Sequence, residues 1–258
     1  MRVAPESQPK VDEQFYELLY ASLTQVRERR EAERGPSGPR DKLYVSEVGT
    51  IIGDSACWRK LWYVFHDAPK DSLPPESLMA FEIGDVIGLR ISNILAAGDH
   101  VQKVQYRLDF SPWPVSGRLD VLLIPKWKRV VEVKSVPCAM LPYLPKQDHV
   151  AQLNLYLHGI GKEPEYVGFH GTLLYVVKDA RKGQPVCRAF EVPYDTKAAL
   201  RTLNAYVRAR QAATGPTEPP RPMGFTGSTY PCAYCVFQTH CWSGKNSNKI
   251  SSERYGPP

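Results

Sequence analysis

The stretch from Val115 to Val136 limits the possible folds more than any other part of this sequence. Two β-rich runs, VSGRLDVLLI and KRVVEVKSV, are separated by a short Pro-Lys-Trp segment, which predicts two strands joined by a tight connection. Because side chains two apart on a strand share a face, we expect Glu132 and Lys134 to point the same way. In the ordinary register of such a hairpin, Asp120 reaches that face too. Two carboxylates and a lysine are therefore predicted to converge.

Such a trio has a chemical use. Carboxylate oxygens suit hard cations such as Mg²⁺ and Mn²⁺, which keep several waters and complete their shell with a substrate phosphate. The ion lowers the pKa of water and neutralises charge on the phosphorus oxygens, while Lys134 can orient the water or help to deprotonate it. The pattern favours phosphodiester hydrolysis. The alternative is that Glu132 and Lys134 form an ordinary solvated strand face.

Three motifs together make the catalytic interpretation the stronger one. GRLD at 117–120, EVK at 132–134, and Gln152 with Tyr156 in HVAQLNLYLHG resemble the RecB-like branch of the PD-(D/E)XK nucleases. The motifs of that branch run G-[RK]-[IL]-D, E-x-K, and Q-x-x-x-Y on the next helix. In the family, the Gln and Tyr pair contacts DNA and supports the active site.

The resemblance covers roughly residues 43 to 243 and implies roles for individual residues. Asp120 and Glu132 would ligate the metal together with the backbone carbonyl of Val133, and Lys134 would position the attacking water. The implied fold is α/β: a restriction-endonuclease-like core with a mixed sheet flanked by helices.

The segment from 73 to 97 predicts a long helix that departs from the family pattern. In the family this helix carries G-x-x-x-H, with the histidine as a metal ligand, but here Gly88 follows Gly84 at that spacing. One possibility is that Glu82 or Asp85 supplies the missing ligand, and we take Glu82 as the candidate. The others are that the strand ligands hold the ion alone, or that activity has been lost.

The cysteines predict a second centre. Cys232, Cys235 and Cys241 form a C-x2-C-x5-C cluster, and Cys57 begins C-x-R-K-L-W-Y. This arrangement resembles the iron–sulfur members of the RecB-like family, the Cas-four CRISPR-adaptation exonucleases and the nuclease domain of AddB, which bind a [4Fe-4S] cluster with one early and three late cysteines. Zinc is the rival, because four thiolates also make a zinc site and His240 lies between two of the cysteines.

The amino-acid composition limits the class of protein but does not identify its function. The 258 residues are 43% hydrophobic and 23% charged, which is ordinary for a soluble globular protein. The net charge of +6 is compatible with a polyanionic partner, although basic soluble enzymes are common. No apolar run approaches the roughly 18 residues of a membrane span, and the N-terminus lacks a secretory h-region. We therefore expect no membrane association and a cytoplasmic location.

The elements expected from hydrophobic periodicity and from helix-ending and turn residues divide the chain into three parts. We expect an N-terminal helix and flexible lead at 1–40, the nuclease domain with iron–sulfur ligands at both ends at 41–243, and a flexible tail at 244–258. Besides the hairpin, the predicted elements are helices at 12–33, 73–97, 146–160 and 195–213 and strands at 101–110, 164–177 and 186–192.

The resemblance implies a Mg²⁺- or Mn²⁺-dependent DNA exonuclease that acts on single strands or DNA ends, with the 5′ to 3′ direction frequent among Cas-four relatives. No P-loop signature is present, so unwinding would require a helicase partner, in recombination or CRISPR adaptation. Two alternatives stay open: a nuclease-fold DNA-binding or adaptor protein with weak or no cleavage, acting in end processing or spacer capture, and a zinc-stabilised structural protein.

Overall fold

The structure is a computed structural model that describes residues 13–33, 40–123 and 126–243. The chain divides into two compact units. The first holds α1 (Glu13–Glu33) and the start of α4 (Pro75–Ala97) up to Ile83, and the second holds the rest. The flexible lead and tail that we expected fall on residues outside the described ranges, and the predicted domain boundaries stay a prediction.

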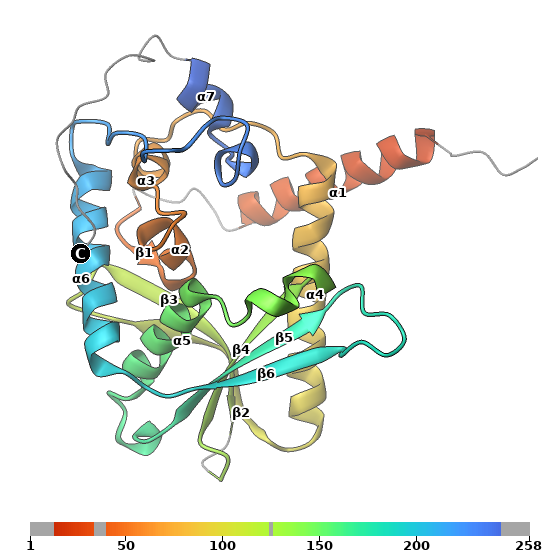
Figure 1. Cartoon of the computed structure of the whole chain (residues 1–258), viewed down its shortest axis with the longest axis vertical. Coiled ribbons are helices and arrows are strands. Elements are labelled where there is room, and N and C mark those ends of the chain that lie inside the picture. Colours follow the sequence, from red (N-terminus) through yellow and green to blue (C-terminus); the bar gives the residue numbers. More distant parts are fainter. Residues whose placement is uncertain (1–12, 34–39, 124–125, 244–258) are drawn as a thin grey trace, which may run out of the picture. The chain divides into compact units, whose positions relative to one another are not determined.

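The second unit is built on one mixed sheet (Figure 1). Its strands are β1 (Leu43–Tyr44), β2 (Val101–Asp109), β3 (Val115–Leu123), β4 (Arg129–Val136), β5 (His170–Val177) and β6 (Cys187–Val192). The order is β1-β3-β4-β5-β6, and β2 also pairs with β3. The pairs β1–β3 and β4–β5 are parallel and the other pairs are antiparallel. The predicted α/β class and mixed sheet are confirmed.

The predicted hairpin corresponds to β3 and β4, although residues 124 and 125 of its connection lie outside the described ranges. The strand predicted at 164–177 starts later than expected, at His170. Pro164 to Tyr166 instead form a short 3-10 turn with proline at its first position. Proline has no backbone N–H to give to a sheet, which explains why the strand cannot include it.

Helices cover both faces of this sheet. Those of the second unit, besides the later part of α4, are α2 (Val48–Ile51), α3 (Trp58–Phe65), α5 (Gln147–Ile160), α6 (Thr196–Thr214) and α7 (Gln238–Ser243). In Figure 1, α5 and α6 lie together on one side of the sheet. On the other side, Ile91 and Leu95 of α4 pack against Val121, Val131 and Val133.

Strand β4 is therefore buried on both faces. Val130 and Val136 belong to the larger core cluster, while Val131 and Val133 belong to the smaller one under α4. A strand covered on both sides is expected to be almost wholly apolar. Among the buried residues of β4, Glu132 is the exception, with 3% of its surface exposed, and a buried carboxylate at that position calls for a reason. Among the described residues, no helix is both long enough and apolar enough to cross a membrane.

Candidate active site

Asp120 and Glu132 meet where the ladder between β3 and β4 ends. The last Cα partners are Val121 and Val131. One step further, the backbone amide of Val133 donates to Oδ2 of Asp120 at 2.9 Å, so that a side chain takes the place of a strand carbonyl. The two carboxylates thus come to the same face, as the side-chain alternation predicts.

Gln105 on β2 holds the other oxygen of Asp120. Its Nε2 donates to Oδ1 of Asp120 at 3.1 Å. Gln105 has a φ of 50°, which is uncommon for a residue other than glycine. The sequence analysis missed this residue because its partner is set by the pairing of β2 with β3, and no motif marks it.

One oxygen of the Glu132 carboxylate accepts two hydrogen bonds, and the other accepts none from the described residues. Its Oε1 accepts hydrogen bonds from Nζ of Lys134 and from Nε2 of Gln152, both at 2.7 Å. Its Oε2 is buried and has no hydrogen-bond partner. Burial raises the pKa of Glu132 to about 7, Lys134 opposes that rise, and the Asp120 carboxylate adds to it. A buried oxygen without a partner is costly, and a cation beside it would supply the missing partner.

Gln152 and Tyr156 stand behind the carboxylates, one turn apart on α5. Both are buried, with 4% and 2% of their surface exposed. Gln152 also donates to the Tyr156 hydroxyl at 3.3 Å, and that hydroxyl donates to the carbonyl of Arg118 at 3.0 Å. Through these bonds α5 contacts both carboxylate-bearing strands. The predicted pair is therefore present at the site, in a supporting position.

His149 lies beside Lys134 and was not a predicted site residue. Its Nδ1 is 2.9 Å from the Tyr175 hydroxyl. Burial, followed by the charge of Lys134, lowers the pKa of His149 to about 4, so the imidazole is neutral near pH 7. Its placement depends on the packing of α5 against β5, which the sequence does not display.

The later part of α4 runs beside β4 but brings no histidine. A Cβ added at Gly84 would lie 3.6 Å from the Ser135 hydroxyl, whereas one added at Gly88 would meet no heavy atom within 4 Å. Gly88 therefore leaves open space where the family has a ligand. Glu82 belongs to the first compact unit and the carboxylates belong to the second, so its assignment as a ligand stays a prediction.

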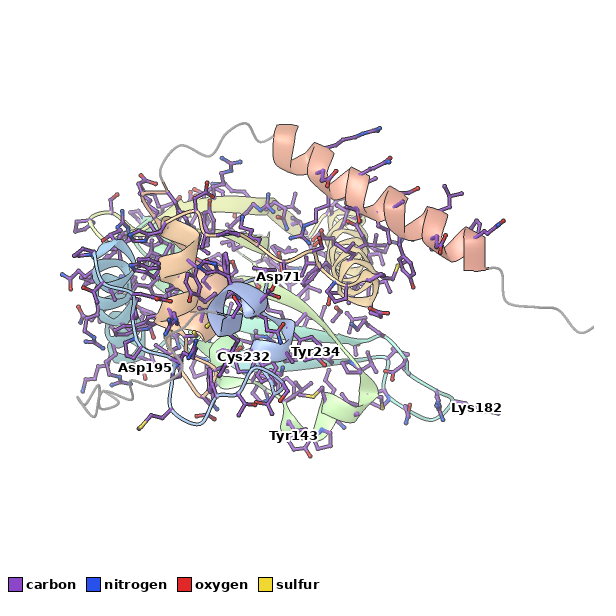
Figure 2. All side chains as sticks on the ribbon, turned by 90° about the horizontal axis from the view of Figure 1, so that it is seen from above. Asp71, Tyr143, Lys182, Asp195, Cys232 and Tyr234 are labelled. Atoms are coloured by element: carbon purple, nitrogen blue, oxygen red, sulfur yellow. The ribbon has the colours of Figure 1, made fainter. Side chains whose placement is uncertain are left out.

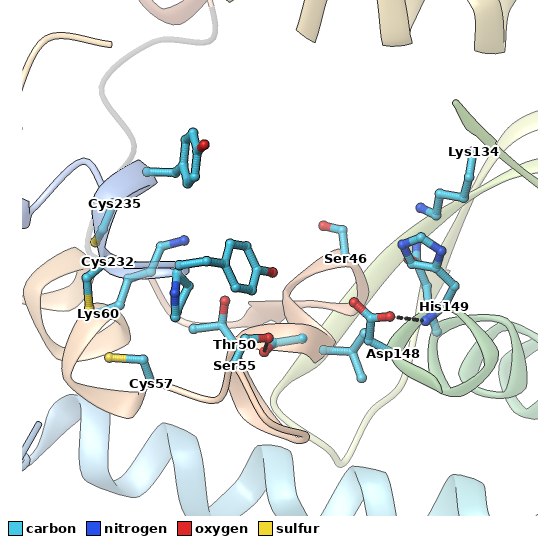
Figure 3. A pocket seen from close by; sticks show the side chains of 16 residues that line it. Ser46, Thr50, Ser55, Cys57, Lys60, Lys134, Asp148, His149, Cys232 and Cys235 are labelled. Carbon is cyan, nitrogen blue, oxygen red and sulfur yellow. Dashed lines mark hydrogen bonds between the residues drawn. The ribbon is translucent and has the colours of Figure 1, made fainter. Parts of the chain in front are cut away.

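The four predicted cluster cysteines gather in one region of the second unit. Burial raises the pKa of Cys57 to about 11, and the charges of Cys235, Cys232 and Cys241 add to that rise. Figure 3 shows the side chains of Cys57, Cys232 and Cys235 together at one end of a pocket. Within the described ranges, no group of three or more His, Cys, Asp or Glu side chains is arranged to hold a single metal ion.

The segment that carries the three late cysteines is fixed to the loop after α3. The amide of Asp71 donates to the carbonyl of Val236 at 2.6 Å, and the amide of Thr239 donates to Oδ2 of Asp71 at 2.8 Å. Figure 2 shows Asp71 near this C-terminal segment. The loop after α3 and the C-terminal segment are thereby held side by side, while a cluster that joins early and late cysteines stays a prediction.

A pocket of about 310 Å³ extends from Lys134 and Gln152 to Cys57, Cys232 and Cys235. Figure 3 shows Lys134 and His149 on one side and Cys57, Lys60, Cys232 and Cys235 on the other. The remaining lining residues are Ser46, Val48, Gly49, Thr50, Ser55, Asp148, Gln152, Tyr230, Pro231 and Tyr234. Lys134 therefore lines a space that the cysteine-bearing segment helps to enclose.

Proteins of known structure include some that resemble this chain in fold. The chain resembles the crystal structure of the protein SSO0001 with a TM-score of 0.55 and 17% identity over 88% of this chain and 96% of that one, a likeness in fold. Two other structures have TM-scores of 0.46 over 67% of this chain. One is an alkaline exonuclease from Laribacter hongkongensis (9% identity, 90% of that chain), and the other is a phage-related exonuclease from Haemophilus somnus 129PT (13%, 92%).

Among curated proteins, no sequence matches this chain. The sequence profile of the PD-(D/E)XK nuclease superfamily, in contrast, matches residues 8–242. That span includes the strand carboxylates, the lysine and the Gln and Tyr pair of α5. The chain therefore belongs to the PD-(D/E)XK nuclease superfamily.

Proposed function

We propose that this protein is a Mg²⁺- or Mn²⁺-dependent DNA exonuclease that hydrolyses phosphodiester bonds in single strands or at DNA ends. The observation that carries the proposal is the unpartnered, buried Oε2 of Glu132 beside the Asp120 carboxylate. A 5′ to 3′ direction is the expectation taken from the Cas-four resemblance.

The donor set fits one small, hard cation. Asp120 and Glu132 would hold it with the carbonyl of Val133, and waters and a substrate phosphate would complete the shell, because Mg²⁺ is usually bound through one or two carboxylates. When bound, such an ion supplies Lewis-acid stabilisation of the charge that develops on the phosphate oxygens.

Lys134 is the residue placed to act on water or substrate. Its ammonium group has three donors, and the 2.7 Å bond to Glu132 uses one of them. The side chain is 23% exposed and lines the pocket, so the other donors can orient an attacking water or stabilise a phosphate oxygen. Gln152 keeps the Glu132 carboxylate in place by donating to the same oxygen as Lys134.

Cleavage of a labelled DNA strand in Mn²⁺ tests the proposal. Asp120→Ala and Lys134→Ala should each lose about 100-fold or more in rate, and the Lys134 variant should lose far less in DNA affinity than in rate, because Lys134 is one of several groups that would contact the strand. Asp109→Ala is the matched control, because Asp109 is an exposed carboxylate on the neighbouring strand whose surface contact with Lys42 contributes little. Equal activity of the Asp109 and Asp120 variants would contradict the assignment.

The open space at Gly88 favours a second candidate, a DNA-binding or adaptor protein that retains the nuclease fold with weak or no cleavage. The same assay separates the two functions. DNA binding without cleavage by the wild-type protein, in either Mg²⁺ or Mn²⁺, would support the adaptor.

We also propose that Cys57, Cys232, Cys235 and Cys241 bind a [4Fe-4S] cluster. The gathering of the four thiols in one region supports it, since the charges of Cys232, Cys235 and Cys241 all act on Cys57. Absorbance of anaerobically purified protein is the test: a [4Fe-4S] protein is brown, whereas a zinc protein is colourless.

A further inference from the structure

Two exposed tyrosines stand on the wall of the pocket that leads to Lys134. Tyr230 and Tyr234 have 71% and 72% of their surface exposed, and both line the pocket. Large aromatic side chains are normally sheltered, so two exposed rings beside one pocket call for a ligand with flat apolar faces. Neither residue belongs to the motifs from which the family was recognised.

The rest of the pocket offers donors for a phosphate backbone, beside one carboxylate, that of Asp148. Lys60 and Lys134 bring two positive charges to its two sides (Figure 3). The hydroxyls of Ser46, Thr50 and Ser55 lie among the other lining groups, and hydroxyls are frequent donors to phosphate oxygens. Cations and hydroxyls for a phosphate backbone, together with aromatic rings for bases, are the two components of single-strand binding sites.

We propose that Tyr230 and Tyr234 stack against bases of a single DNA strand whose backbone runs past Lys60 to the carboxylates Asp120 and Glu132. The inference rests on the proposed nuclease function and specifies its substrate as single-stranded at the point of entry. A base pair hides its faces within the helical stack, so rings that stack on separate bases select unpaired nucleotides. The tyrosines are binding residues and take no part in bond cleavage.

Binding of a fluorescent oligothymidine, measured by anisotropy in EDTA, tests this without cleavage. Tyr230→Ala and Tyr234→Ala should each weaken affinity by roughly 5-fold to 150-fold, the range found for loss of one base–aromatic stack. Tyr→Phe variants keep the ring and should bind as wild type does. Tyr→Leu variants keep apolar bulk without a ring and should bind like the alanine variants, which separates stacking from a folding defect.

Tyr194→Ala is the control for loss of an exposed tyrosine elsewhere. Tyr194 contacts His158 through its hydroxyl, and His158 lies about 13 Å along α5 from His149 of the pocket. Its affinity for the oligonucleotide should equal that of wild type. An abasic strand supplies the second control, because with no bases to stack the wild type and both alanine variants should bind it alike.

The inference is overturned if the alanine variants bind oligothymidine as tightly as wild type, or if they lose the same affinity for the abasic strand. It is also overturned if a blunt duplex binds as tightly as the single strand and the substitutions weaken both equally. Absence of cleavage in Mn²⁺ with stacking intact would instead refute the exonuclease proposal, so the two failures are distinguishable.

Discussion

Replacing Glu132 with Gln tests whether the buried carboxylate destabilises the folded protein, and whether a bound cation removes that destabilisation. Burial raises the pKa of Glu132 from its ordinary value of 4.5 to about 7. In the unfolded chain the group ionises near pH 4.5, so the folded state loses stability as the pH rises from there to about 7 and loses no more above it. The difference between the two values corresponds to about 3 kcal/mol.

Glutamine keeps the shape and the acceptor oxygen but cannot ionise. In urea unfolding of metal-free protein, the free energy of unfolding of wild type should therefore fall by roughly 2 to 3 kcal/mol relative to Glu132→Gln between about pH 5 and about pH 8. Added Mn²⁺ should raise the Tm of wild type at the higher pH and leave the variant unchanged.

Glu191→Gln is the matched control for loss of a carboxylate at an exposed position, because the Glu191 side chain is 57% exposed on β6. The reasoning would be refuted if the difference in free energy of unfolding between wild type and Glu132→Gln stayed constant from about pH 5 to about pH 8. It would mean that the carboxylate of Glu132 is solvated or already neutralised in the folded protein.

Three further substitutions give separate tests. Gly117→Ala would place a Cβ 2.7 Å from Val45 and 2.8 Å from Tyr156, so urea unfolding should show a loss of about 1 to 3 kcal/mol; a neutral result would contradict the close packing. Gly88→His enters open space and should fold like wild type while binding Mn²⁺ more tightly in a calorimetric titration; unchanged affinity would mean that this helix position does not reach the ion. Cys57→Ser should abolish the iron–sulfur absorbance and lower iron content, and full retention of both would exclude Cys57 as a ligand.

The parts of the site that lie on one strand could be predicted from the sequence. The alternation of side chains placed Glu132 and Lys134 on one face. In the structure, Nζ of Lys134 lies 2.7 Å from Oε1 of Glu132. The spacing of Gln152 and Tyr156 on a helix likewise predicted a pair one turn apart. Both inferences need only the repeat of a regular element.

The parts that depend on contacts between elements could not be predicted. Gln105 meets Asp120 because β2 pairs with β3 in one register, and His149 meets Lys134 because α5 packs against the sheet. Neither has a local pattern that sets it apart from a surface polar residue. The late start of β5 had a local signal in Pro164, which the length of the apolar run outweighed in the prediction.

The contact between Gly117 and Tyr156 joins two motifs that are 39 positions apart in the chain. The tyrosine ring occupies the volume that any larger residue at 117 would need, and its hydroxyl holds the strand at the next residue, Arg118. The glycine of the first motif and the tyrosine of the last thus pack directly against each other. A chimera that exchanges either segment should therefore fold only if the incoming segment keeps the glycine of the first motif or the tyrosine of the last.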